Sequence, residues 1–149
     1  MKISDIKVNR LIAGAIIIMT CSQAFAESNP EPLELQKIMK DMGKNMQVIA
    51  DGISREDWQL VEKTAPLIAD HPQPPIFEKM KILAFVGTEV SKFKGYDGKT
   101  HGAARVLGES AAREEGYAVI SNFATLQNTC LTCHQSYRKS FQEHFYGKR

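Results

Sequence analysis

The chain has 149 residues, a length that suits one domain and is short for two. Hydrophobic residues make up 43 % and charged residues 24 %, which excludes a disordered tail, a collagen-like fibre and a protein with many membrane spans. The net charge is +2 and the sequence has no stripe of Lys and Arg, so we expect no nucleic acid as partner. Three cysteines in so short a chain are an odd count that requires an explanation.

Residues 1–26 are predicted to be a signal peptide that is removed on export. Lys2, Lys7 and Arg10 precede the apolar run 11–19, and Ala24-Phe25-Ala26 has the A-x-A form of a cleavage site. The apolar run is well short of the ~20 residues that a spanning helix needs, so we expect no stable membrane insertion of the mature chain. A lipoprotein would use Cys21 as its acylated residue, but Ile18-Met19-Thr20 lacks the small residues that usually precede such a cysteine.

Removal of the signal peptide leaves a mature chain of residues 27–149. This chain has 16 basic and 16 acidic residues, and therefore no net charge. Its two cysteines, Cys130 and Cys133, belong to one motif, which accounts for the odd count. Export places the protein outside the cytoplasm, and this style of signal indicates a bacterial periplasm.

Helices are predicted along the mature chain, and no segment indicates a strand. The first helix is predicted from apolar residues that recur with the 3.6-residue period of one buried face. It begins near Pro32 and ends at Asp51-Gly52, since glycine commonly follows the last turn of a helix. The second helix has Ser54 as its N-cap and Asp57 at the capping-box position, and Pro66 kinks or shortens it near its end. The apolar face of the first helix contains Leu35, Ile38, Met39, Met42, Met46 and Ile49.

The middle of the chain is predicted to be less regular. Residues 71–75 are rich in proline and form an extended link. A short apolar helix follows over about 76–86 and is interrupted at Gly87. Residues 94–98 have two glycines and are predicted to form a loop.

Two long helices complete the chain. The third main helix is Ala-rich and covers about 100–114, and the last covers about 117–144, with apolar residues at steps of three and four. Four main helices with short links predict an all-α fold, an antiparallel four-helix bundle.

The last helix carries the motif Cys130-Leu131-Thr132-Cys133-His134, which is the C-x-x-C-H attachment site of a c-type haem. Two thiols three residues apart lie on one side of a helical turn, so each can add to one vinyl group of the haem as a thioether. His134 then supplies the proximal imidazole ligand of the iron. The pattern predicts one covalently bound haem c, held by Cys130, Cys133 and His134.

Other uses of the cysteine pair fit less well. A dithiol of thioredoxin type opens a helix in a βαβ unit, whereas this pair lies deep in a helical chain. A zinc site needs two further ligands at metal spacing, and the histidines of the sequence show no such cluster. A disulfide would strain a helical C-x-x-C.

A methionine of the first helix is predicted to fill the distal position of the iron. A thioether ligand raises the potential of a haem and closes it to gases. The candidates are Met39, Met42 and Met46, and the alternative for each is a flexible filler of the core.

The mature chain resembles the class II cytochromes c, the family of cytochrome c′ and its six-coordinate relatives of the cytochrome c-556 type. The resemblance rests on the haem motif near the C-terminus, followed by Tyr137 and Arg138, and on the first-helix segment Ile38-Met39-Lys40-Asp41-Met42-Gly43. It covers essentially the whole mature chain and implies a four-helix bundle with covalently bound haem c.

The resemblance also implies a ligand set. In low-spin members a first-helix methionine ligates the iron, and the matching position here is Met39, with Met42 as the alternative. The family has an Arg near a haem propionate where this chain has Leu35. Substitutes for that Arg are Lys37, Lys40 and Arg138.

The function that the resemblance implies is a periplasmic carrier of single electrons with a six-coordinate low-spin haem, and not an enzyme. Its partners would be redox proteins of unknown identity that dock weakly and transiently, and a homodimer is possible. The alternative is a five-coordinate cytochrome c′-like protein that binds nitric oxide or carbon monoxide. A third hypothesis, a small peroxidase, has His71 and His101 as its candidate acid–base groups by composition alone.

Overall fold

The computed structural model describes residues 31–147, so the predicted signal peptide lies outside the described residues. Between residues 31 and 147 the chain is helical and contains no strand, which confirms the predicted all-α class. No helix in this part of the chain is both long enough and apolar enough to cross a membrane. The elements are α1 (Glu34–Ser54), α2 (Trp58–Ala69), α3 (Ile76–Val86), the 3-10 helix η1 (Gly87–Glu89), α4 (Val90–Ala112) and α5 (Gly116–Tyr146).

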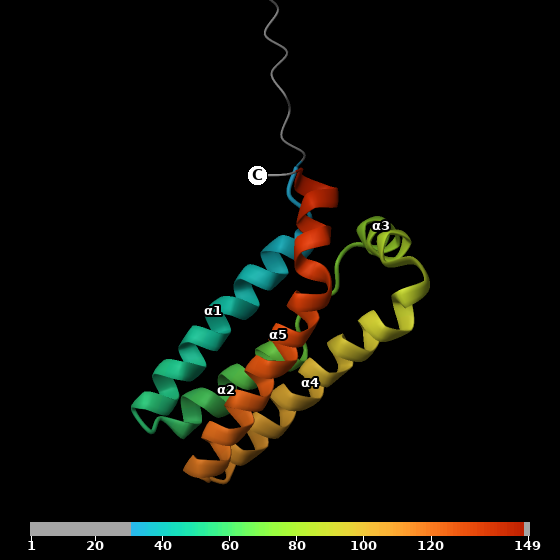
Figure 1. Cartoon of the computed structure of the whole chain (residues 1–149). Coiled ribbons are helices and arrows are strands. Elements are labelled where there is room, and N and C mark those ends of the chain that lie inside the picture. The colour runs from blue at the N-terminus through green and yellow to red at the C-terminus, as the bar shows by residue number, and fades with distance from the viewer. Residues whose placement is uncertain (1–30, 148–149) are drawn as a thin grey trace, which may run out of the picture.

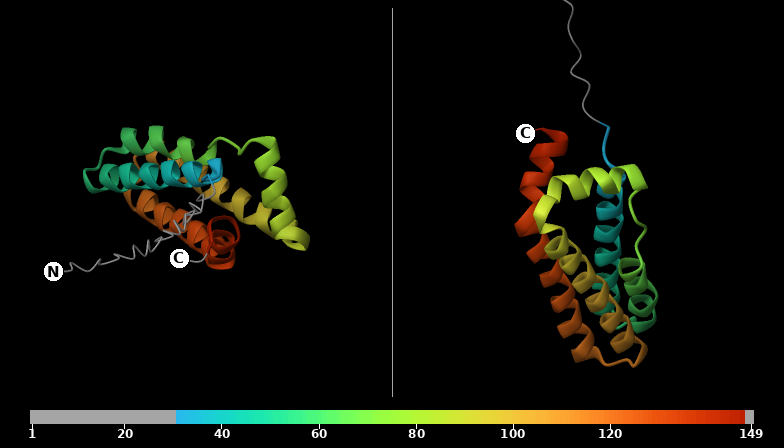
Figure 2. Two further views of the ribbon diagram at one scale, coloured as in Figure 1. Left: turned by 90° about the horizontal axis from the view of Figure 1, so that it is seen from above. Right: turned by 90° about the vertical axis from the view of Figure 1, so that its right-hand side faces the viewer.

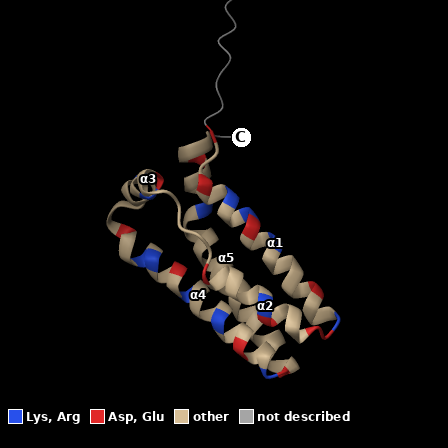
Figure 3. Ribbon diagram, turned by 180° about the vertical axis from the view of Figure 1, so that it is seen from behind, with Lys and Arg blue, Asp and Glu red and all other residues tan. Residues whose placement is uncertain are grey.

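Four of the helices, α1, α2, α4 and α5, pack against one another and run in alternating directions (Figure 1). α4 packs along both α2 and α5, and α1 packs along α2, whereas α1 and α5 meet at only a few residues. α3 lies crosswise over one end of the bundle (Figure 2). The seam between α1 and α5 is therefore the loosest contact between neighbouring helices of the bundle. Lys and Arg are interspersed with Asp and Glu along α1 and α4 (Figure 3).

The core consists of two clusters of buried side chains. The main cluster fills the end of the bundle where α1 turns into α2 and α4 into α5. The aromatic cluster fills the other end, where α3 crosses. The main cluster contains Ile49, Val61, Ala65, Ile68, Ala69, Ala104, Leu107, Ala111, Val119 and Leu126. The aromatic cluster contains Ile82, Val86 and Tyr137, with Leu35, Phe85, Val90, Phe93, Tyr96, Cys133 and Phe141 packed against them.

The turn between α1 and α2 differs from its prediction. α1 continues past Gly52 to Ser54, and a Cβ on the buried Gly52 would lie 3.0 Å from Val61 Cγ2. This glycine therefore allows α1 to approach α2 closely and does not end the helix. The hydroxyl of Ser54 bonds within its own helix. The N-cap of α2 is Asp57, whose Oδ1 accepts a hydrogen bond from the Leu60 amide at 3.0 Å.

The predicted loop at residues 94–98 is also wrong, because this segment is part of α4, which begins at Val90. Its two glycines are exposed, and a Cβ on either would meet nothing within 4 Å. Phe93 and Tyr96 pack against Tyr137 of α5, with ring centroids 5.3 and 6.1 Å apart. These tertiary contacts outweigh the low helix propensity of glycine.

α4 begins at Val90 and not near residue 100 as predicted, whereas the remaining predicted boundaries agree with the structure to within about two residues. The link 71–75 is extended, and α3 ends at Gly87, which has a left-handed φ of +59°. Pro66 does not shorten α2, which continues to Ala69. α5 covers the predicted last helix and is slightly longer at both ends.

The capping contact of Asp57 gives a test of this turn. We expect Asp57→Ala to lower the free energy of unfolding by about 1 kcal/mol, because the Leu60 amide loses its acceptor. Ser54→Ala is the matched control and should change stability by less than about 0.5 kcal/mol, since this hydroxyl is exposed at the end of α1. Urea denaturation followed by circular dichroism measures both. A larger loss in Ser54→Ala than in Asp57→Ala would contradict the assignment.

Candidate functional site

The C-x-x-C-H motif lies in the middle of α5, where the two clusters of the core meet. Cys130 packs against the main cluster and Cys133 against the aromatic cluster. Both thiols are free and partly buried. The motif therefore spans the junction of the two clusters, with the two thiols one helical turn apart.

The local electrostatics keep the thiols protonated. Burial raises the pKa of Cys130 and of Cys133, and the negative charge of Asp97 raises the pKa of Cys133 further. His134 is exposed at the surface of α5, but partial desolvation, assisted by the charge of Arg138, lowers its pKa. Near neutral pH its imidazole is therefore mostly uncharged, which is the form that binds metals.

The three methionines of α1 differ in their surroundings. Met42 and Met46 pack against the main cluster, and Leu35 packs against the aromatic cluster. Met39 follows Leu35 by one turn and precedes Met42 by about one turn, so it lies at the level of the junction. Its side chain is 39 % exposed, although it belongs to the apolar face of α1. Met39 is therefore the one of these three methionines that is not packed against either cluster of the core.

Met39 and the cysteine motif thus lie on two helices, each next to residues that pack against both clusters. Met39 is on α1 and the cysteine motif is on α5, and these two helices border the loose seam. Within the described residues, Lys37 forms an ion pair with Glu34 at 3.1 Å, whereas neither Lys40 nor Arg138 forms one.

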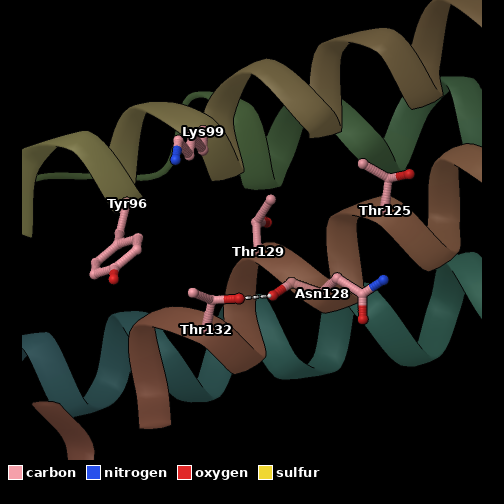
Figure 4. Close-up of a pocket in the computed structure, with 6 residues that line it drawn as sticks. All are labelled: Tyr96, Lys99, Thr125, Asn128, Thr129 and Thr132. Carbon is pink, nitrogen blue, oxygen red and sulfur yellow. Dashed lines mark hydrogen bonds between the residues drawn. The ribbon is translucent and has the colours of Figure 1, made fainter. Parts of the chain in front are cut away.

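Two small cavities lie in the bundle, and one of them reaches the motif at Thr132. One of about 210 Å³ lies between α4 and α5 (Figure 4), and one of about 220 Å³ lies between α1, α2 and the link that follows α2. Both are smaller than the roughly 300 Å³ at which pockets for small organic ligands begin. The first is lined by Tyr96, Lys99, Thr125, Asn128, Thr129 and Thr132. The second is lined by Ile38, Asp41, Met42, Asn45, Leu67, His71 and Pro72.

A second group of metal-binding side chains, His71, Asp97 and His101, comes together between α4 and the link that follows α2. The two Nε2 atoms of His71 and His101 lie 3.0 Å apart. Asp97 Oδ1 lies 3.6 Å from the first and 3.4 Å from the second. Two of the histidines therefore do form a group with metal spacing, although it includes neither cysteine and so does not complete a zinc site at the motif.

The sequence did not predict this cluster, because residues 94–98 were predicted to form a loop. Asp97 and His101 are four residues apart, a spacing that puts two side chains on one face only if the segment is helical. His71 joins them from the link after α2, 30 residues before His101. The D-x-x-x-H spacing was the one local signal available.

One hydrogen bond fixes the position of a proton in the cluster. His71 Nδ1 donates to the carbonyl oxygen of Pro72 at 2.9 Å, so this nitrogen carries a proton. Asp97, whose Oδ1 lies 3.6 Å from His71 Nε2, raises the pKa of His71 against the opposing effect of burial. The same interaction with His71, together with the charge of His101, lowers the pKa of Asp97 and keeps its carboxylate ionised.

No protein family, no curated protein and no solved structure was found to match the chain. Function is therefore inferred from the chain's own residues: a C-x-x-C-H motif at the junction of the core, an uncovered methionine at the same level, and a separate cluster of two histidines and an aspartate.

Proposed function

We propose that the protein is a periplasmic c-type cytochrome that carries single electrons through one covalently bound haem. The observation that carries this proposal is the C-x-x-C-H motif on a long helix, with both thiols free, partly buried and one turn apart. The donors present suit the group, because thioethers need two reduced thiols on one face and the iron needs an imidazole beside them.

Each residue of the motif would have a distinct task. A bound haem would supply the one-electron iron couple. Cys130 and Cys133 would anchor it by thioether bonds, and His134 would be the proximal ligand. The few contacts between α1 and α5 support a position at this seam, since the helices there are not closed by packing.

Met39 is proposed as the distal ligand. Met42 and Met46 already contribute to the main cluster, and moving either to a ligand position would leave a gap in a packed core. Met39 has no such task in the core and is partly exposed. A sixth ligand would exclude external gases, which supports electron transfer over gas binding.

Two basic side chains are available to neutralise the propionates of the haem. The resemblance left this task to Lys37, Lys40 or Arg138, and Lys37 already pairs with Glu34. Lys40 is one residue from Met39, and Arg138 is one turn beyond His134 on α5. The mature chain has equal numbers of basic and acidic residues, and this absence of net charge suits weak and transient docking to redox proteins.

Covalent attachment can be tested through the three cysteines. We expect the chain exported to a bacterial periplasm to keep one haem after acidic acetone has removed all non-covalent haem. The double variant Cys130→Ser/Cys133→Ser should keep none, because it has no thiol to form a thioether. Cys21→Ser is the matched control and should keep one. Mass spectrometry of the intact chains measures the haem, and an unmodified wild-type chain would overturn the proposal.

The distal ligand can be tested by spectroscopy of single methionine variants. We expect the wild-type reduced protein to have a low-spin spectrum that carbon monoxide does not change. Met39→Ala should become high-spin and bind the gas, because it opens the sixth position. Met42→Ala and Met46→Ala should keep the wild-type spectrum. Each should instead lower the free energy of unfolding, by up to about 5 kcal/mol, because it leaves a cavity in the core.

Two outcomes would contradict this ligand assignment in different ways. A gas-sensitive spectrum in Met42→Ala alone would move the ligand one turn along α1. A wild-type protein that is already high-spin and binds carbon monoxide would favour the five-coordinate alternative.

A further inference from the structure

We propose that His71, Asp97 and His101 form a binding site for a divalent transition-metal ion of the zinc type, separate from the haem ligands. The site uses two imidazole nitrogens and one carboxylate oxygen, supplied by the link after α2 and by α4. It does not depend on the proposed haem, because it shares no residue with the C-x-x-C-H motif.

The spacing of the three donor atoms fits such an ion. Zinc binds imidazole and carboxylate at about 2.0–2.1 Å in tetrahedral geometry, which puts neighbouring donor atoms about 3.3 Å apart. The three separations here are 3.0, 3.4 and 3.6 Å. One ion can therefore contact His71, Asp97 and His101 together, with only small movements of the side chains.

The orientation of the two rings also points to a shared ion. The Nε2 atoms are 3.0 Å apart while the ring centroids are only 4.8 Å apart, at an interplanar angle of 79°. The two rings are therefore steeply inclined to each other, and both Nε2 atoms lie within 3.6 Å of Asp97 Oδ1, so that the three donor atoms form one compact group.

The hydrogen bond at the far nitrogen of His71 prepares this ring for a metal. The proton on Nδ1 is held by the Pro72 carbonyl, so in the neutral ring the lone pair is on Nε2, which faces the cluster. A ligand histidine typically donates its second N–H to a carbonyl or carboxylate in this way, which fixes both tautomer and ring direction.

The site is sheltered on one side and open on the other. The side chains of His71 and His101 are 5 % and 19 % exposed, whereas that of Asp97 is 46 % exposed. An ion can therefore enter past Asp97, and its fourth position can take a water molecule from that side. Arg105, one turn beyond His101 on α4, is held by Asp70 in an ion pair of 3.0 Å.

The surrounding backbone is suited to hold the donors in place. Asp97 and His101 lie one turn apart on α4, and the proline-rich link restricts the position of His71. The ion pair of Arg105 with Asp70 joins the same two segments next to the site. Binding of an ion would add a second cross-link between the link and α4, and so stabilise the fold.

The test is a titration of the purified mature protein, as isolated, with Zn²⁺ alone in isothermal calorimetry. We expect one saturable ion per chain and a higher midpoint of thermal unfolding in its presence. His71→Gln and His101→Gln should each weaken binding by at least about 100-fold, because each removes a direct ligand. His144→Gln, which alters an exposed histidine near the end of α5, is the matched control and should bind as the wild type does.

Asp97→Asn provides a test if loss of the buried His71 prevents folding. Its half-exposed amide fits the same space but is a poor zinc ligand, so binding should weaken while the circular dichroism spectrum is unchanged. The proposal is wrong if no saturable binding occurs, or if His71→Gln and Asp97→Asn bind zinc as tightly as the wild type. In that case the cluster is a hydrogen-bonded contact between the link and α4.

X-ray absorption at the zinc edge separates this site from the cysteines. A shell of nitrogen and oxygen at about 2.0–2.1 Å supports the histidine–aspartate site, whereas sulfur at about 2.3 Å would assign the ion to Cys130 and Cys133 and overturn the proposal. The haem spectrum of the same sample is recorded separately. If the chain has no haem but binds zinc through nitrogen and oxygen, the proposed cytochrome function is wrong and the proposed metal site is supported.

Discussion

The close packing of small side chains between α2, α4 and α5 is the constraint on which the other features depend. Gly108 lies against Ala65, where a Cβ would be 3.5 Å from the alanine Cβ, and Ala104 and Ala111 are buried in the same cluster. Small residues let helix axes approach closely, so this end of the bundle is tight. The other end must accommodate Tyr137 and its aromatic neighbours together with α3, and there the helices diverge (Figure 1).

The residues able to carry chemistry gather where the tight end gives way to the wider one. Cys130 contacts the main cluster and Cys133 the aromatic cluster, so the motif spans this junction. The charge of Asp97 influences the pKa of Cys133, which shows that the histidine–aspartate cluster lies close to the motif in space. A tightly packed core has no room for a cofactor or an ion, and side chains on widely separated helices cannot bind the same group. At the junction the helices are far enough apart to leave room and close enough for their side chains to bind one group.

The two proposed sites differ in the metal chemistry that they suit. Thiols, a thioether and an imidazole across α1 and α5 are the donors of a c-type haem. Two imidazoles and a carboxylate across α4 and the preceding link are the donors of a borderline divalent ion such as zinc. The difference in donor type gives each site its own selectivity, even though both are held by the same four helices.

The sequence by itself determined the all-α class, most helix ends and the C-x-x-C-H motif, because these depend on local spacing along the chain. Its helical pattern also identified the methionines of α1 but did not separate them, since all three share one face, and only the family resemblance favoured Met39. Only the tertiary structure decided that Met42 and Met46 fill the core while Met39 does not. The same holds for the meeting of His71 with His101, because contact between residues so far apart depends on how α2 packs against α4. The helical state of residues 94–98, on which that cluster depends, was likewise decided by aromatic contacts with α5 against the local preference of two glycines.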